Sequence, residues 1–406
     1  MKVLHINQTD IIGGAGIAAY RLHLGLRARG VDSKLLVATS SSGSDHVSVI
    51  SRKPYLEHAL GKVTSRLGLN YLNIVSSGSM IDHPFHRDAD VLNLHNLHGG
   101  YFNYRALPKV TRGKPVVFTL HDMWSFTGHC AYSFDCDRWQ TGCGQCPYPE
   151  TYPSITRDAT ALEWRLKDGV YERCDLHVVT PSRWLCRLAD GSMLGRFQVH
   201  HIPNGIDLAV FRPLDTRQSR SELGIPQQAA VLLHAAASLL DTRKGADLVL
   251  NALARLPESV KRDVVLVVMG RGGGFLEEET GIRVMDLGYV ESEDVKAAAY
   301  SAADLLIFPT RADNLPLILQ ESLACGTPMV SFNVGGVPDM VRPGATGYLA
   351  EAENQDDFAE GIIRLLDDSA LRERMGIRCR EIAQEEYDIG MIARKYQDLY
   401  NEILNK

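Results

Sequence analysis

The chain has 406 residues, of which 45% are hydrophobic and 23% are charged, and its formal net charge is −6. This length suits two hydrophobic cores better than one, and the composition is typical of a globular protein, not of a disordered one. The charge and the lack of a basic stripe argue against a nucleic-acid binder. We find no signal peptide and no run of about 18 apolar residues. We therefore expect a soluble cytoplasmic protein, and peripheral contact with the inner face of a membrane stays open.

Short apolar runs alternate with helical patterns along the first half. The runs are rich in β-branched residues and end in polar or glycine positions, as buried parallel strands do. The predicted strands are 3–6, 34–38, 91–95, 116–120, 177–180 and 199–202, and the predicted helices are 15–28, 159–172 and 182–190.

The second half repeats this alternation. Its predicted strands are 231–236, 264–269, 305–308 and 329–332, and its predicted helices are 247–255, 292–301, 317–324 and 356–366. Alternating strands and helices imply a parallel sheet covered on both faces, so we expect the α/β class with two Rossmann-like, doubly wound domains. The turn at Asn204-Gly205 divides them into 1–205 and 206–387. A last helix within 388–406 is expected to pack back on the first domain.

Two features of the first half carry candidate chemistry. Gly13 and Gly14 precede a long helix, where glycines let a ligand approach the backbone and free N–H groups can meet an anion. A plain tight turn is the alternative. His121 follows the strand 116–120, and the carboxyl end of a parallel strand faces the ligand crevice of an open sheet. Here the alternative is a hydrogen-bonded structural histidine, and His95 and His98 could reach the same crevice.

Two features of the second half are stronger. Lys244, with Arg243 before it, lies in a strand-to-helix loop where a cation can meet phosphate, although a solvated charge pair would look the same. Asp313 follows a buried strand, and Glu321 lies eight residues on, just over two helical turns away. A carboxylate is a natural acceptor for the vicinal hydroxyls of a sugar or a ribose. The helix start between Asp313 and Glu321 suits a diphosphate.

Four cysteines crowd into one short segment: Cys130, Cys136, Cys143 and Cys146. In a reducing compartment such a cluster favours metal over disulfide, and four thiolates would form a closed structural zinc site. Buried or free thiols are the alternative, and His129 could replace one ligand. A catalytic zinc is not expected, because four protein ligands leave no open position.

Taken in this order, the motifs resemble the retaining GT-B glycosyltransferases of family 4, also called group 1, over nearly the whole chain. The matching features are the diglycine loop, the segment 202–207, Lys244-Gly245 and the block 313–328. Within the family, the chain is most similar to bacterial exopolysaccharide and colanic-acid-type enzymes. The resemblance implies two domains that face an interdomain cleft. It also implies transfer of a hexose-type sugar from a UDP- or GDP-sugar to a saccharide or lipid-linked acceptor, with no cofactor required for catalysis.

The resemblance also implies roles for single residues. Lys244 would neutralise the donor diphosphate, Asp313 would contact the transferred sugar, and Glu321 would accept the ribose hydroxyls. Asn314 and the N–H groups near Leu317 would bind the donor. Gly14 would lie against the diphosphate from the other domain, and His121 would lie near the sugar.

Three positions depart from the family pattern. Asp313 stands where the family has glutamate, Pro316 removes an N–H, and Ser238 or Leu239 stands where an arginine is usual. We expect Arg243 to supply the missing charge. A nucleotide-sugar-binding GT-B protein with epimerase activity, or with no catalysis, stays as the alternative. A nicotinamide oxidoreductase is disfavoured, because neither half carries G-x-G-x-x-G.

Overall fold

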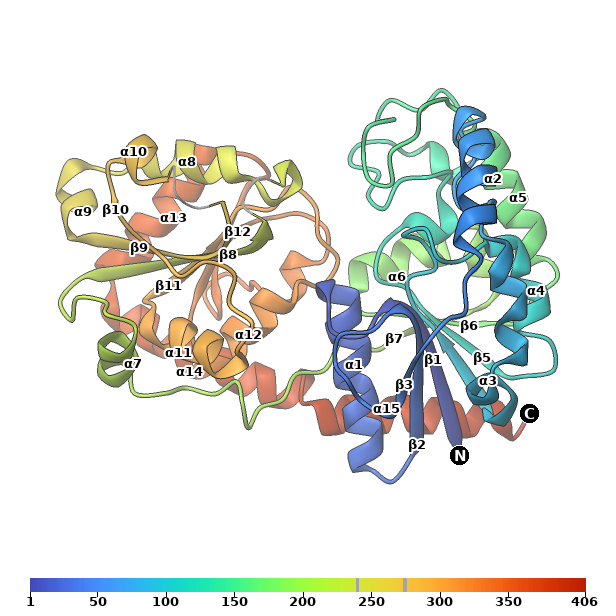
Figure 1. Cartoon of the computed structure of the whole chain (residues 1–406). Helices are drawn as coiled ribbons and strands as arrows, with labels where there is room; N and C mark the ends of the chain where they lie inside the picture. Colours follow the sequence, from blue (N-terminus) through green and yellow to red (C-terminus); the bar gives the residue numbers. More distant parts are fainter. Residues whose placement is uncertain (239–240, 273–275) are drawn as a thin grey trace. The chain divides into compact units, whose positions relative to one another are not determined.

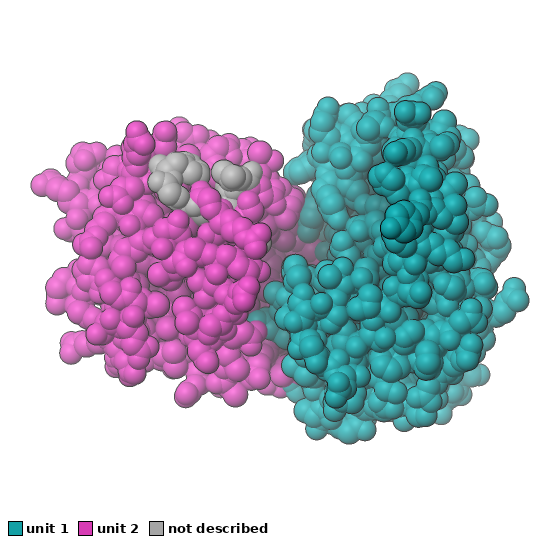
Figure 2. Space-filling view, viewed as in Figure 1, with its two compact units in different colours: residues 1–205, 390–406 teal, residues 206–389 magenta. Residues whose placement is uncertain are grey.

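The chain folds into two compact units. The computed structural model describes residues 1–238, 241–272 and 276–406 (Figure 1). The first unit comprises Met1–Gly205 and Gly390–Lys406, and the second comprises Ile206–Ile389 (Figure 2). Within the described ranges, no helix is both long and apolar enough to cross a bilayer.

The first unit, whose residues are all described, contains a parallel sheet in the order β3-β2-β1-β4-β5-β6-β7. Its strands are β1 (Lys2–Thr9), β2 (Asp32–Thr39), β3 (Val47–Val49), β4 (Val91–Leu94), β5 (Val116–Thr119), β6 (His177–Thr180) and β7 (Gln198–His201). Ile6 on β1 is paired with Leu36 on one side and with Leu94 on the other. The order reverses between β1 and β4, so the loops after these strands border a crevice.

Helices cover both faces of this sheet. They are α1 (Gly13–Ala28), α2 (Pro54–Arg66), α3 (Pro84–Asp88), α4 (Leu107–Val110), α5 (Thr160–Tyr171), α6 (Arg183–Asp190) and α15 (Ile389–Leu404). On one face, α1 and α15 enclose a core that includes Leu22, Leu26 and Tyr400. The buried residues of α15 recur at helical spacing, which gives it one apolar side for the sheet. The phenol oxygen of Tyr400 also accepts a hydrogen bond from Asn93 Nδ2 at 2.7 Å.

The second unit repeats the winding. In its described part the sheet is parallel, in the order β10-β9-β8-β11-β12-β13. The strands are β8 (Ala230–Ser238), β9 (Val264–Arg271), β10 (Arg283–Asp286), β11 (Leu305–Phe308), β12 (Met329–Phe332) and β13 (Gly347–Ala350). This is the order of the first six strands of the first unit. The order reverses again, here between β8 and β11, and in open α/β sheets the loops after the strands at such a point are the usual place for a ligand.

Two apolar clusters cover the faces of the second sheet. The helices are α7 (Thr216–Glu222), α8 (Ala246–Ala254), α9 (Glu258–Asp263), α10 (Leu276–Thr280), α11 (Glu293–Ala302), α12 (Leu317–Cys325), α13 (Gln355–Asp367) and α14 (Ser369–Glu386). One cluster includes Leu319 of α12 and Ile382 of α14, and the other includes Leu248 of α8 and Ile362 of α13. The predicted α/β class with two Rossmann-like, doubly wound domains is confirmed.

Candidate functional site

Two basic side chains meet one carboxylate at the carboxyl edge of the second sheet. The loop after β8 forms the short 3-10 helix η6 (Thr242–Lys244), and the loop after the neighbouring strand β11 carries Asp313. Lys244 Nζ lies 2.5 Å from Asp313 Oδ2, and Arg243 Nη1 lies 3.3 Å from the same oxygen. Arg243 also donates to the carbonyl oxygen of Ala312 at 2.8 Å. The structure therefore brings three of the predicted site residues into direct contact.

Burial and charge act against each other in this cluster. Burial is the largest influence on Lys244 and, despite the attraction of Asp313, holds the pKa of the ammonium below its usual value. Burial would raise the pKa of Asp313, but Lys244 and then Arg243 outweigh it and lower that pKa. The side chains of Lys244 and Asp313 remain 16% and 11% exposed. The ion pair is thus mostly buried but still open to a ligand.

Glycines let the loops at this edge of the second sheet approach each other closely. Gly245 has φ = 71°, and a Cβ there would come within 1.9 Å of the carbonyl oxygen of Pro309. Gly335, at φ = 54°, has its Cβ position 2.1 Å from the carbonyl oxygen of Asp313. That carbonyl accepts a hydrogen bond from the N–H of Gly336 at 3.0 Å. A side chain at either glycine would therefore push the loops apart and displace Asp313.

The other predicted residues of the second unit lie along α12. Glu321 is buried, and its Oε2 accepts a hydrogen bond from the hydroxyl of Tyr300 on α11 at 3.0 Å. Asn314 is buried in the loop before the helix. Leu317 begins α12, whose N-cap residue Pro316 offers no side-chain cap within the described part of the chain. Tyr300 was not anticipated from sequence, because it lies 21 residues before Glu321 on another helix.

The position where the family usually has an arginine lies at the end of β8. Ser238 ends β8, whereas Leu239 lies outside the described residues. Arg243 lies beside Lys244 and approaches Asp241 at 3.4 Å as well as Asp313. Its charge is therefore divided between two carboxylates.

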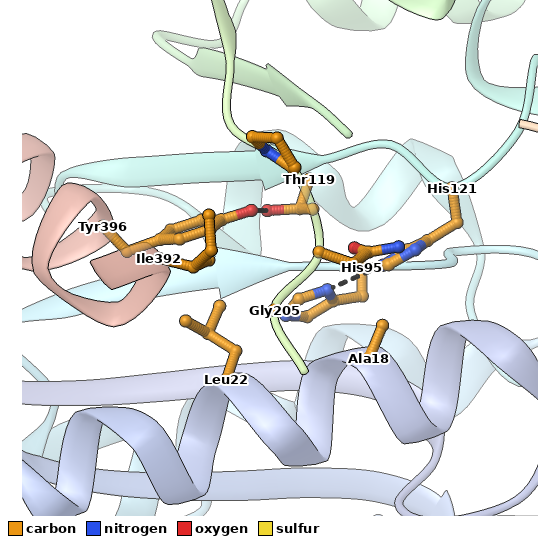
Figure 3. Close-up of a pocket in the computed structure, with 10 residues that line it drawn as sticks. Ala18, Leu22, His95, Thr119, His121, Gly205, Ile392 and Tyr396 are labelled. Atoms are coloured by element: carbon orange, nitrogen blue, oxygen red, sulfur yellow. Dashed lines mark hydrogen bonds between the residues drawn. The ribbon is translucent and has the colours of Figure 1, made fainter. Parts of the chain in front are cut away.

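A small pocket lies at the carboxyl edge of the first sheet. Figure 3 shows His95 and His121 on one side of it, with Ile392 and Tyr396 of α15 on the other. The hydroxyls of Tyr396 and Thr119 lie 3.2 Å apart. The lining residues are Ala18, Leu22, His95, Thr119, His121, Pro203, Asn204, Gly205, Ile392 and Tyr396. His121, two residues after the end of β5, thus lines this pocket.

Three histidines form a hydrogen-bonded row that leads inward from this pocket. His121 Nε2 lies 3.0 Å from His95 Nδ1, and His95 Nε2 lies 3.0 Å from His5 Nδ1. Burial lowers the pKa of His121 to about 4 and that of His5 to about 3, and it holds the pKa of His95 well below the usual value. All three rings are therefore neutral near pH 7. His5 was not anticipated, because only the pairing of β1 with β4 brings it beside His95.

His98 and Asp122 form a separate pair. His98 Nε2 lies 2.7 Å from Asp122 Oδ2, and Asp122 Oδ1 accepts the N–H of Trp124 at 2.9 Å. Burial would raise the pKa of Asp122, but His98 more than compensates, and the pKa lies below its usual value. His98 thus does not join the histidine row, and its partners anchor the loop after β5.

Gly13 and Gly14, which were expected to precede the helix, form the first turn of α1, and a buried carboxylate, that of Asp10, lies in the loop that leads into it. Asp10 accepts hydrogen bonds from the N–H groups of Ser41 and Ser42, at 3.0 and 2.9 Å. Burial opposes its ionisation, but these and neighbouring hydrogen bonds lower the pKa of Asp10 to about 2. Apart from the chain neighbours of Gly14 and the nearby backbone of its own helix, no atom of the first unit, all of which is described, lies within 4 Å of a Cβ built on Gly14. Packing within this unit therefore does not explain a glycine at that position.

The zinc site at Cys130, Cys136, Cys143 and Cys146 stays a prediction, and each of these thiols interacts electrostatically with at least one other of the four. Among the described residues, no three or more His, Cys, Asp or Glu side chains are placed to hold a metal ion. Burial raises the pKa of Cys130 to about 12 and that of Cys143 to about 11, so these thiols are protonated near pH 7. Cys146 Sγ lies 3.1 Å from Nε2 of His129, the residue that could replace one ligand. Elemental analysis of protein purified under reducing conditions would separate this arrangement from a four-thiolate site.

A buried lysine fixes the start of the cysteine segment. Lys167 of α5 donates to the carbonyl oxygens of Trp124 at 2.6 Å and Thr127 at 2.9 Å. Burial lowers its pKa to about 8. Trp124 lies beneath it, with Lys167 Nζ 3.7 Å from a ring centroid. The long loop after β5 is thus tied to α5.

Family models match both halves of the chain. Residues 12–210 match the model described as Glycosyltransferase Family 4, and residues 215–382 match the model described as Glycosyl transferases group 1. One similar protein bears the name colanic acid biosynthesis glycosyl transferase WcaC, from Escherichia coli K12. It is 26% identical over 87% of this chain and 88% of its own.

Solved structures share the fold at lower identity. Sucrose-phosphate synthase from Thermosynechococcus elongatus superimposes with a TM-score of 0.72 at 20% identity, over 100% of both chains. HepE from Anabaena, in a complex with UDP-glucose, has a TM-score of 0.70 at 18% identity, over 99% of this chain and 100% of its own. By its two family matches and its paired doubly wound sheets, the chain belongs to the GT-B glycosyltransferases of group 1.

Proposed function

We propose that this glycosyltransferase moves a hexose-type sugar from a nucleoside-diphosphate sugar to a saccharide or lipid-linked acceptor, with retention of the anomeric configuration. The observation that carries the proposal is the cluster of Lys244, Arg243 and Asp313 at the carboxyl edge of the second sheet. HepE, which has the same fold, binds UDP-glucose, and WcaC is named for colanic acid biosynthesis. Both relatives favour a nucleotide-sugar donor and a polysaccharide or glycoconjugate product.

In this proposal the second unit binds the donor. The ammonium of Lys244 then pairs with the diphosphate, either instead of Asp313 or together with it, because a diphosphate presents more negative charge than a single carboxylate. Asp313 is then available to accept hydrogen bonds from the hydroxyls of the transferred sugar. Glu321 accepts hydrogen bonds from the ribose hydroxyls through Oε1, while its Oε2 accepts the hydrogen bond from Tyr300. The uncapped start of α12, near Asn314 and Leu317, offers backbone N–H groups to phosphate.

The first unit contributes His121 and the loop at Gly14. We infer that His121 carries its proton on Nδ1. In the described chain, His5 Nε2 is buried without a partner, and a buried N–H without an acceptor is costlier than a bare lone pair. His5 therefore donates from Nδ1 to His95, and His95 donates from Nδ1 to His121 Nε2. His121 is then fixed as a hydrogen-bond donor towards the sugar.

Catalysis in this scheme depends on position and charge. The acceptor hydroxyl attacks the anomeric carbon on the face that the diphosphate leaves. The departing phosphate oxygen takes the acceptor proton, so no protein nucleophile is needed. Lys244 and the dipole of α12 stabilise the charge that develops on the leaving group. The scheme requires no metal.

A panel of nucleotide sugars tests the proposal. The wild-type chain is mixed with UDP- and GDP-sugars, and its unfolding temperature and the slow release of nucleoside diphosphate are measured. A donor at 100 times its Kd should stabilise the protein by about 2.7 kcal/mol. If neither nucleotide sugars nor UDP and GDP shift the unfolding temperature, the chain does not bind this class of donor.

A further inference from the structure

The helix α2 (Pro54–Arg66) buries a charged side chain and exposes its apolar ones, the opposite of a helix that packs on a core. Of its side chains, all of which the structure describes, only Glu57 is buried. The Glu57 carboxylate accepts hydrogen bonds from Arg52 Nε at 2.7 Å and from the N–H of Ser76 at 3.0 Å. Surface helices usually bury an apolar stripe and expose their charges. Here a neutralised carboxylate holds the helix to the unit.

The apolar residues of α2 form a stripe that faces solvent. Leu56, Leu60, Val63 and the C-cap residue Leu67 are spaced by four, three and four positions, which places them on one side of a helix. Their exposures run from 36% to 57%, and Tyr55 in the first turn is 92% exposed. Among the described residues, the core clusters of the first unit include none of them. Figure 1 shows α2 at the surface of this unit.

Positive charge flanks the stripe. Lys53, Lys62 and Arg66 are exposed, whereas Glu57, the one acidic residue between positions 53 and 67, is already paired with Arg52. This local excess of positive charge contrasts with a net charge of −6 for the whole chain. An exposed apolar stripe bordered by cations, with no exposed acid, fits the boundary between lipid headgroups and acyl chains.

We propose that α2 lies flat in the surface of an anionic lipid bilayer, with Leu56, Leu60 and Val63 among the acyl chains and Lys62 and Arg66 on the headgroups. A two-fold contact with α2 of a second copy fits the surface poorly, because it would bring the same cations together with no exposed acid between positions 53 and 67. The proposal goes beyond sugar transfer. Its test needs no donor, so its failure would leave the proposed reaction standing.

Vesicle flotation tests the proposal with the full chain. The purified protein is mixed with vesicles of phosphatidylglycerol and phosphatidylcholine in equal parts, or of phosphatidylcholine alone. We expect flotation with the anionic vesicles and much less with the neutral ones, because cations and apolar side chains contribute together. Equal flotation with both kinds of vesicle, or with neither, would overturn the proposal.

Two variants assign the binding to α2. Leu56→Glu/Val63→Glu should lower the vesicle partition coefficient by about tenfold or more, and Lys62→Ser/Arg66→Ser should lower it roughly thirtyfold. Ile377→Glu is the matched control, since Ile377 is 59% exposed but lies on α14 in the second unit. It should float like the wild type.

The unfolding temperatures and the sedimentation of the same proteins complete the test. Both α2 variants should unfold near the wild-type temperature, because their side chains are exposed. If the α2 variants float like the wild type, or if the wild type sediments as a dimer that Val63→Glu separates, the lipid assignment is wrong.

Discussion

Lys244 has a structural role in addition to its proposed role in donor binding. It neutralises the carboxylate of Asp313 in the absence of a donor. Its ammonium is mostly buried and lies against Asp313, so removing it would leave Arg243 as the cation in contact with that carboxylate among the described residues. A loss of activity after substitution could then reflect a disturbed fold. Only a paired substitution distinguishes the two effects.

We predict that Lys244→Ala abolishes transfer and also lowers the free energy of unfolding by about 1–3 kcal/mol, because a buried charge loses its main partner. Lys244→Ala/Asp313→Asn should regain most of that stability but no transfer. Urea unfolding and product formation are measured on both variants and on Asp313→Asn. Wild-type transfer by Lys244→Ala would exclude the phosphate role.

For Gly14 we predict that substitution raises stability but weakens donor binding. Its Cβ position is open, and it lies in the first turn of α1, so alanine should raise the free energy of unfolding by up to about 1 kcal/mol. If the donor approaches this backbone, the same methyl group should weaken donor binding. Gly16→Ala is the comparison, since its Cβ would lie 2.6 Å from Thr9 Oγ1 and should destabilise the protein. Unchanged donor affinity in Gly14→Ala would remove Gly14 from the site.

At the scale of elements, the histidine row joins three adjacent strands. If His5 donates its hydrogen bond to His95 and His95 donates to His121, nitrogen-15 NMR should show the proton of His121 on Nδ1. His95→Phe should release His121 Nε2 from its partner and shift the tautomer towards Nε2–H. An unchanged His121 spectrum in His95→Phe would mean that the row does not set the proton position.

The loop after β5 depends on α5 through Lys167. We predict that Lys167→Met lowers the free energy of unfolding by about 1–3 kcal/mol, because two buried carbonyl oxygens lose their donor. Thermolysin should then cut within 127–159 faster than in the wild type. Lys395→Met, at an exposed position of α15, should match the wild type in both measurements. Equal proteolysis of all three proteins would contradict the role of Lys167.

The sequence predicts the inner elements better than the outer ones. All ten predicted strands are present, and the three that were not predicted, β3, β10 and β13, lie at sheet edges. An edge strand is only partly covered, so it needs no continuous apolar run. Of the longer helices in the described chain, α2 and α14 were not predicted, because α2 buries only Glu57 and few of the 18 residues of α14 are buried.

The same distinction applies to the site. Lys244 and Asp313 were found separately from local motifs, but their contact joins positions 69 residues apart and depends on the pairing of β8 with β11. Neither the histidine row nor the Tyr300–Glu321 contact has a local motif. For the cysteines, the spacing predicts a zinc site, and this stays a prediction.

Over the whole molecule, buried neutral histidines should control the response to acid. Burial lowers the pKa of His23 and His234 to about 4, in addition to the three histidines of the row. Unfolded histidines titrate near pH 6.5, so between about pH 6.5 and 4 the unfolded chain binds more protons than the folded one. The stability that these groups give above pH 6.5 is therefore lost as the pH falls through this window.

Urea unfolding at pH 7.5, 6.0 and 5.0 checks this prediction. The free energy of unfolding should fall with decreasing pH, and each histidine contributes about 1.4 kcal/mol per unit of pKa difference. His5→Phe should make the decline shallower, because it removes one such group. Equal declines in the two proteins would show that His5 does not contribute.

The return of α15 to the first unit has a consequence for biosynthesis. The second unit is one continuous stretch and can close its core as soon as residue 389 has left the ribosome. The first unit emerges earlier, but the side of its sheet that carries Val3 and Val91 has to wait for Tyr396 and Tyr400. During the intervening translation this apolar surface is open to chaperones and to other nascent chains. The half that is synthesised first is thus the half that completes its folding last.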